Sequence, residues 1–303
     1  NMPIRMIALD LDRTTLNREG HLSQENRRAL EEAIRAGIYV VPASGRAAGS
    51  FPAEIMELPG LEYLITSNGA AVYRMGKKSW KPDSFSSAGS VSGSAEMRET
   101  GSSLSCLQRF LLQPAMVRKV MELTEQAGIT YEALVEGKAY ADPAYISDPT
   151  GFGAVREAVP YIRRTRIPVE DIRGFLRSHE NQLDSLDIIV GDPEKKKQLM
   201  ALLNKECADI YVTSSVEQLI EISDRRAGKH SAVKFLRERL EIAPEEVAAF
   251  GDGDNDAEML REAGVGIAVE NASPACLAAA DAVTRSCDEN GVAYGFREIL
   301  RLF

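Results

Sequence analysis

The stretch ALDLDRTTLN, from Ala8 to Asn17, decides how the whole sequence is interpreted. It continues an apolar run and then reaches two aspartates, Asp10 and Asp12, separated by a single leucine. Two carboxylates this close repel each other, and burying either of them is costly unless a cation lies nearby. The pair therefore either ends a strand in contact with water or holds a metal ion.

Strand and helix patterns alternate at both ends of the chain. Ser23 is a typical N-cap for an amphipathic helix that stops at Gly37. Nearly continuous apolar runs, as in a parallel sheet covered on both faces, predict strands at 4–11, 38–46, 247–252 and 265–270. This alternation predicts an α/β core with a mostly parallel sheet flanked by helices.

The middle of the chain breaks this alternation. A segment at 84–105 is rich in serine and glycine, which predicts a mobile loop or an insertion. Regular patterns then return and predict helices at 116–126 and 192–206 and strands at 131–134, 186–190 and 210–222. We therefore predict a core built from 1–81 and 224–303, with an α+β domain inserted at 82–223.

Composition limits the partners and the location. The formal net charge of -9 argues against broad contact with nucleic acid or with an acidic membrane. No apolar run approaches the roughly 20 residues that span a bilayer, and no secretory leader precedes Met2. The four cysteines lack the spacing of a zinc site or a disulfide framework. These features predict a cytoplasmic protein that binds neither nucleic acid nor membranes.

Polar residues end three of the predicted strands. They are Asp10 and Asp12 after the first strand, Ser44, Gly45 and Arg46 after the second, and GDGDND (Gly251–Asp256) after a later one. Lys229 opens the helix before that later strand. Ligands of open α/β sheets bind beyond the carboxyl ends of parallel strands. Two acidic strand ends that face each other form an oxygen-rich site, which suits Mg²⁺ better than zinc.

The motifs together resemble those of the haloacid dehalogenase-like phosphatases, Cof-type branch. The matching segments are DLDRT (Asp10–Thr14), ASGR (Ala43–Arg46), GKHSA (Gly228–Ala232) and GDGDND (Gly251–Asp256), in the family's order. The long interval between the second and third motifs is where the Cof type carries its cap domain. The resemblance implies a Rossmann-like core, an inserted cap that selects the substrate, and an Mg²⁺-dependent phosphatase acting on a small phosphate monoester such as a sugar phosphate.

The resemblance also implies a role for each motif residue. Asp10 would attack phosphorus and become an aspartyl-phosphate, and Asp12 would protonate the leaving oxygen and then activate water. Mg²⁺ would be held by Asp10, the backbone carbonyl of Asp12, Asp252 and Asp256. Lys229 would supply a further positive charge. The phosphoryl oxygens would be held by Ser44, Gly45 and Arg46, with Asn68 and Asn255 as helpers or as residues that only shape turns.

Two other functions share these core motifs: a phosphohexomutase and a non-catalytic module that binds phosphate ligands. Arg13 departs from the family pattern because glycine is usual at that position. We expect an ordinary or mildly strained backbone at Arg13 and a side chain that points into solvent. The basic run at 163–166 is expected to form a solvated face.

Overall fold

Strand β1 (Met6–Leu9) lies between β12 and β2 in a five-stranded sheet with the order β14-β13-β12-β1-β2. All four pairings in this sheet are parallel, which confirms the predicted α/β core. The computed structural model describes residues 3–76 and 104–303. The predicted loop at 84–105 therefore lies outside the described residues except for its last two positions.

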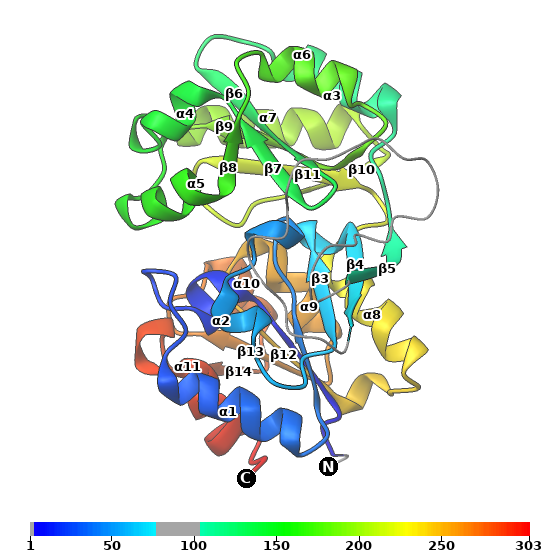
Figure 1. Ribbon diagram of the computed structural model, residues 1–303, viewed down its shortest axis with the longest axis vertical. Helices are drawn as coiled ribbons and strands as arrows, with labels where there is room; N and C mark the ends of the chain where they lie inside the picture. Colours follow the sequence, from blue (N-terminus) through cyan, green and yellow to red (C-terminus); the bar gives the residue numbers. More distant parts are fainter. Residues whose placement is uncertain (1–2, 77–103) are drawn as a thin grey trace.

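The core is assembled from both ends of the chain (Figure 1), and its elements follow the predicted order to within a few residues. Its strands are β1 (Met6–Leu9), β2 (Tyr39–Pro42), β3 (Tyr63–Thr66), β4 (Ala71–Met75), β5 (Leu104–Arg109), β12 (Val247–Gly251), β13 (Val265–Val269) and β14 (Ala282–Thr284). Its helices are α1 (Gln24–Arg35), α2 (Ala53–Met56), α8 (Lys229–Arg239), α9 (Ala257–Glu262), α10 (Pro274–Ala279) and α11 (Gly291–Tyr294).

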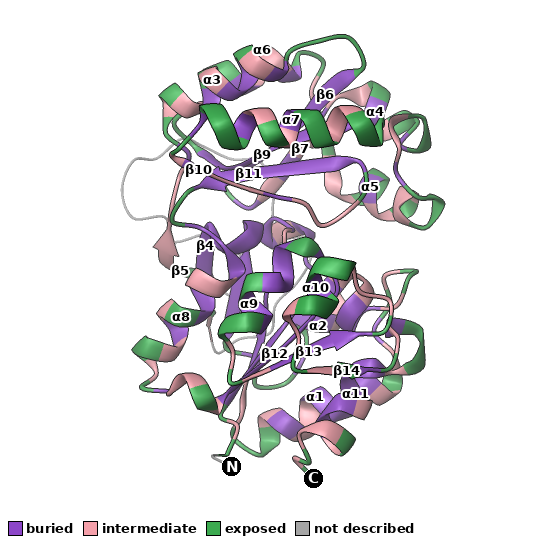
Figure 2. Ribbon diagram, turned by 180° about the vertical axis from the view of Figure 1, so that it is seen from behind, coloured by how far each residue is buried: buried purple, intermediate pink, exposed green. Residues whose placement is uncertain are grey.

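Helices cover both faces of the parallel sheet. Helix α1 begins as predicted, because the Ser23 side chain accepts a hydrogen bond from the backbone N–H of Asn26. One apolar cluster joins α1 and α11 to the sheet through Leu30 and Val292, and a second joins α8 and α9 through Leu236 and Leu260. The strands between them are buried almost throughout, as Figure 2 shows. The sheet therefore holds the residues at its strand ends in fixed positions.

Strands β3, β4 and β5 form a small antiparallel sheet within the core, separate from the parallel sheet. A parallel bridge from Ala43 to Ile65 connects it to the end of β2. Strand β5 lies inside the range 82–223 that the sequence assigned to the inserted domain, yet it pairs with β4. Leu104 belongs to the core cluster, whereas Leu112 belongs to the cluster of the other domain. We therefore propose a later boundary and define the cap as residues 112–224.

The cap is a six-stranded sheet in the order β10-β11-β9-β6-β7-β8, antiparallel except for the pair β7 and β8. Its strands are β6 (Ile129–Val135), β7 (Lys138–Ala141), β8 (Arg166–Pro168), β9 (Leu183–Val190), β10 (Ile210–Thr213) and β11 (Leu219–Asp224). Its helices are α3 (Pro114–Thr124), α4 (Pro143–Ser147), α5 (Val159–Thr165), α6 (Ile172–Ser178) and α7 (Pro193–Glu206). Helices α3, α6 and α7 cover the sheet face that is turned away from the core (Figure 1).

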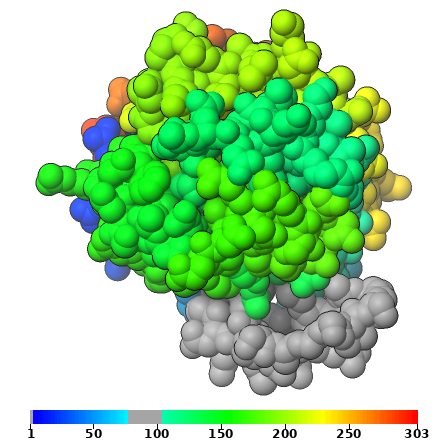
Figure 3. Space-filling view, turned by 90° about the horizontal axis from the view of Figure 1, so that it is seen from above, coloured from blue at the N-terminus to red at the C-terminus, as the bar shows by residue number. Residues whose placement is uncertain are grey.

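The chain passes between core and cap twice, and the two crossings touch each other. The guanidinium of Arg226, on the return crossing, lies 4.5 Å from the ring centroid of Phe110, on the outgoing one. Figure 3 shows the cap from above, where it covers most of the core. Among the residues that the structure describes, none of the helices has the length and apolar character that a bilayer crossing requires.

Candidate active site

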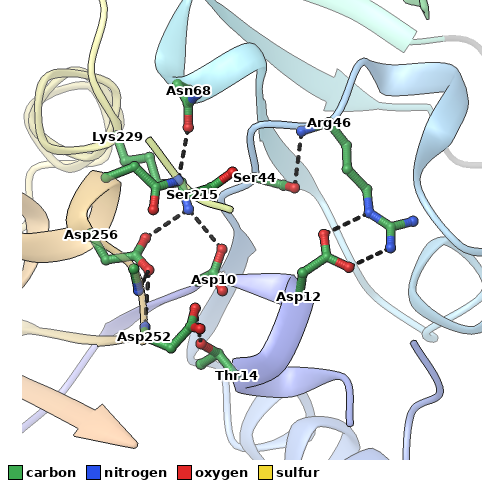
Figure 4. A network of polar contacts seen from close by, with 12 residues as sticks. Asp10, Asp12, Thr14, Ser44, Arg46, Asn68, Ser215, Lys229, Asp252 and Asp256 are labelled. Carbon is green, nitrogen blue, oxygen red and sulfur yellow. Dashed lines mark hydrogen bonds and ion pairs between the residues drawn. The ribbon is translucent and has the colours of Figure 1, made fainter. Parts of the chain in front are cut away.

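Three carboxylates converge at the carboxyl ends of β1 and β12 (Figure 4). Asp10 follows β1 directly, while Asp252 and Asp256 follow β12, and oxygens of all three lie within 4.8 Å of one another. These two strands are neighbours in the parallel sheet, so their ends lie at the same edge. The Asp10 Oδ2 atom is buried and accepts no hydrogen bond from the described residues. The triad therefore offers unused oxygen ligands to a cation.

Lys229 neutralises part of this negative charge. Its ammonium group, fully buried, donates hydrogen bonds of 2.7 Å to Asp10 Oδ1 and of 2.7 Å to Asp256 Oδ1. Burial alone would lower the pKa of Lys229, but the two carboxylates outweigh it and raise that pKa. Lys229 is therefore a permanent cation.

The remaining charge is still negative. Burial and the nearby Asp256 raise the pKa of Asp10 to about 7, although Lys229 opposes the shift. Burial, together with Asp10 and Asp256, raises the pKa of Asp252 well above its usual range. Three buried carboxylates share one ammonium group, so a bound divalent cation would relieve the repulsion that remains.

Asp12 points away from the triad and pairs with Arg46. The guanidinium donates two parallel hydrogen bonds to the Asp12 carboxylate, 2.8 Å from Nε and 2.5 Å from Nη2. Burial disfavours the charged form of Asp12, but the interaction with Arg46 outweighs burial and lowers the pKa of the carboxyl. The sequence had assigned Arg46 to the phosphoryl oxygens, whereas here its guanidinium is committed to Asp12 and to the Ser50 carbonyl. Arg46 therefore positions Asp12 at the edge of the cleft.

The backbone at Arg13 is mildly strained, which is one of the two expected outcomes, whereas its side chain differs from the expectation. Its φ of 62° lies in the left-handed region that favours glycine, and its side chain is half-buried in the cleft wall instead of pointing into solvent. The Asn271 side chain donates a 2.8 Å hydrogen bond to the Arg13 carbonyl and helps to hold this conformation. The turn after β1 thus keeps the shape that glycine would give it, at the cost of mild strain.

The other predicted ligand residues gather around the end of β2. Ser44 is buried and its hydroxyl accepts a hydrogen bond from the Arg46 N–H. A Cβ on Gly45 would lie 2.6 Å from the Glu221 Oε1 of the cap, so a larger residue would have to displace that carboxylate. Asn68 has a φ of 53° and accepts a 3.0 Å hydrogen bond from Asn255. The two asparagines therefore shape the site whether or not they touch substrate.

A cavity of about 150 Å³ lies between the triad and the cap sheet. Its core wall includes Asp10, Asp12 and Ser44, which the sequence identified. Its cap wall includes Arg166, from the basic run at 163–166, and residues that sequence analysis did not single out, among them Glu132, Tyr161, Asp187 and Glu221. Glu132 is the only charged residue of its strand, whereas the strands of Asp187 and Glu221 each carry a second carboxylate, Asp184 and Asp224.

Tyr161, on α5, joins the two walls. Arg46 of the core stacks on its ring at 3.9 Å from the centroid, and Arg166 of the cap lies 4.8 Å from the same centroid. Arg166 is buried and forms a two-pronged ion pair with Glu132. The expectation of a solvated face at 163–166 was therefore wrong for Arg166, because this side chain turns inward to a buried carboxylate. It holds for Arg163 and Arg164, which are exposed.

The comparisons with known proteins agree with this geometry. A family model for haloacid dehalogenase-like hydrolases matches residues 7–89 and 103–296. Phosphatase YwpJ of Bacillus subtilis (strain 168) is 28% identical and covers 98% of this chain and 100% of its own. The 5-amino-6-(5-phospho-D-ribitylamino)uracil phosphatase YwtE, from the same organism, is 29% identical and covers 98% of both chains.

The fold is shared with solved structures as well. A haloacid dehalogenase-like hydrolase from B. subtilis superposes with a TM-score of 0.77 at 24% identity, over 98% of this chain and 100% of the other. The family model covers most of the described chain, including the strands that carry all three triad aspartates. This protein therefore belongs to the haloacid dehalogenase-like hydrolase family, as its motifs indicated.

Proposed function

We propose that this phosphoric monoester hydrolase is an Mg²⁺-dependent phosphatase that cleaves a small ester, a sugar phosphate in the first instance, through an aspartyl-phosphate on Asp10. The observation that carries the proposal is the state of the Asp10 carboxylate. One of its oxygens is held by Lys229, and the other is buried without a hydrogen bond from the described residues. The names of the relatives support the activity, and one of them describes an ester of a ribityl group.

The donor set fits Mg²⁺. The triad offers carboxylate oxygens and neither imidazole nor thiolate, which matches the preference of this ion. We assign the metal to Asp10, the Asp12 backbone carbonyl, Asp252 and Asp256. When bound, the ion would keep Asp10 ionised and neutralise charge on the phosphoryl group. Two oxygens of Asp256 are already used by Lys229 and by backbone N–H groups, so its contribution would run partly through water.

The residues then divide the reaction between them. An Asp10 oxygen attacks phosphorus and the ester bond breaks, while the leaving oxygen takes a proton from Asp12. Because the pairing with Arg46 favours the ionised carboxyl, Asp12 must leave the guanidinium and gain this proton before the ester bond breaks. Water next attacks the aspartyl-phosphate, gives its proton to Asp12 and releases inorganic phosphate with the Asp10 carboxylate restored. Lys229 fixes Asp10 for in-line attack, and Ser44 with the neighbouring backbone amides holds the phosphoryl oxygens.

Release of inorganic phosphate is the decisive measurement. We expect the protein to hydrolyse a panel of phosphate monoesters with Mg²⁺ and to lose this activity in EDTA. Added Ca²⁺ should restore little activity, because the looser coordination of Ca²⁺ disturbs the in-line geometry. Transfer between sugar positions that requires a bisphosphate activator would instead establish the phosphohexomutase. Phosphate binding without turnover of any ester would establish the binding module. Full activity in chelator would contradict the metal assignment.

Asp12→Asn should slow hydrolysis by a factor on the order of 10²–10⁴, which is the usual contribution of general acid–base catalysis. The variant keeps Asp10 and the triad, so it should still bind beryllofluoride in the presence of Mg²⁺. Rate and binding are measured on the same preparation. A variant that neither turns over nor binds the phosphoryl mimic would place the Asp12 side chain in metal binding instead.

We also propose a cytoplasmic location. All four cysteines are unpaired, and unpaired thiols persist in reducing compartments. The partner that we propose is the small phosphate ester alone.

A further inference from the structure

The cap sheet carries a row of three carboxylates opposite the triad. Glu132 on β6 lies directly opposite Asp187 on β9, and Asp187 lies directly opposite Glu221 on β11. We call Glu132, Asp187 and Glu221 the carboxylate row. Residues directly opposite on antiparallel strands point to the same face, and like charges placed so are destabilising. All three side chains are at least nine-tenths buried and line the cavity.

The row is only partly compensated. Arg166 takes both oxygens of Glu132, at 2.9 and 3.0 Å. Glu221 accepts hydrogen bonds from the Asn68 side chain and from the Ser215 N–H, neither of which carries charge. Asp187 receives one hydrogen bond, from Ser185 to Oδ1. Within the described residues no donor reaches Asp187 Oδ2, and this side chain forms part of the cavity wall.

The two arginines beside the carboxylate row already have partners, whereas Arg13 lies on the core wall of the cavity. Arg46 is paired with Asp12 and Arg166 with Glu132. Burial, with Glu221 and Glu132 next in effect, raises the pKa of Asp187 well above its usual range. The ionised form of Asp187 therefore lacks compensation, and a ligand group that donates hydrogen bonds to Oδ2 would stabilise it. A second anion on the ligand would instead meet the carboxylate row with no free cation among the described side chains of the cap wall.

We propose that the carboxylate row, through Asp187, selects leaving groups that present hydroxyl or ammonium donors and rejects leaving groups that carry a second negative charge. This inference rests on the proposed phosphatase function and names the chemistry of the alcohol that leaves. The phosphoryl end of the substrate lies at the triad, so the far end reaches the cap wall. Neutral polyols and amino alcohols share the donor chemistry that the row requires.

Matched esters test the proposal in the wild-type protein. Glucitol 6-phosphate and 6-phosphogluconate differ in a terminal alcohol against a carboxylate, and we expect kcat/KM to favour glucitol 6-phosphate by about tenfold or more. The kcat/KM for glucosamine 6-phosphate should equal or exceed that for glucose 6-phosphate. A clear excess would show that charge contributes more to the preference than hydrogen bonding does. Equal kcat/KM for glucitol 6-phosphate and 6-phosphogluconate would overturn the proposal. So would a kcat/KM for glucosamine 6-phosphate more than about threefold below that for glucose 6-phosphate.

Asp187→Asn tests the residue itself. The change removes the charge and keeps the shape, so the preference for glucitol 6-phosphate over 6-phosphogluconate should fall below about threefold. Glu217→Gln is the matched control, because Glu217 is an exposed carboxylate on the same cavity and its loss should leave the ratio unchanged. An unchanged ratio in Asp187→Asn would overturn the assignment.

p-Nitrophenyl phosphate tests the phosphatase activity separately from selection by the carboxylate row, because its leaving group has no hydrogen-bond donor that the row could recognise. If the wild-type protein hydrolyses it but does not discriminate within the matched pairs, the inference about the carboxylate row fails and the phosphatase stands. If no ester is hydrolysed, the proposed function itself fails.

Discussion

Asp10→Asn is expected to reduce kcat by a factor on the order of 10⁴ or more, because it removes the nucleophile of the proposed covalent route. Burial already raises the pKa of Asp10 to about 7, so a neutral amide of the same shape suits this position. The variant should therefore fold normally. Phosphate release under single-turnover conditions measures the chemical step, and circular dichroism checks the fold.

The same segment supplies a control for Asp10→Asn. Asp254 is an exposed carboxylate beside the triad, and its contact is with Ser273. Asp254→Asn removes the same charge and should leave kcat nearly unchanged. Activity of Asp10→Asn within tenfold of the wild-type protein would rule out the covalent mechanism.

Lys229→Met is expected to have the largest effect on stability. The substitution leaves Asp10 and Asp256 buried without their shared cation, and breaking a buried ion pair from one side costs about 3–5 kcal/mol. The free energy of unfolding, measured by urea titration in EDTA, should fall by this amount. Hydrolysis should fall as well, by a factor on the order of 10² or more, because Asp10 loses its anchor.

Added Mg²⁺ should restore part of the stability of Lys229→Met, because an ion that binds only the folded state favours it. Lys234→Met is the control, since Lys234 lies on the same helix and is exposed. A loss in Lys229→Met no larger than in this control would show that the buried ammonium group does not stabilise the site.

The parts of the site that could be predicted are those fixed by the parallel sheet. Asp10 and Asp252 follow apolar runs, and neighbouring parallel strands end at one edge, so their meeting follows from the pattern alone. Lys229 begins the helix before the second of these strands and is carried to the same edge. The resemblance of the motifs to the family also implies a role for each of these residues.

The parts that could not be predicted depend on contacts between distant segments. Arg46 pairs with Asp12 while it stacks on Tyr161 of the cap, and nothing local in the sequence specifies that contact. The left-handed turn at Arg13 is supported by Asn271 from the far end of the chain. The carboxylate row requires the register of three antiparallel strands with long connections, and that register is set by packing. The position of β5 was missed for the same reason.

The contact between Phe110 and Arg226 has a consequence for folding. Core pairing must bring Met6 beside Val247, with the entire cap between them in the chain. When the cap is folded, its two ends lie in contact, so the loop that the core must close is effectively as short as the two crossings. The entropy of loop closure changes by only about 0.6 kcal/mol for each doubling of length. A cap joined to the core in this way therefore adds almost nothing to the free-energy cost of forming the core sheet.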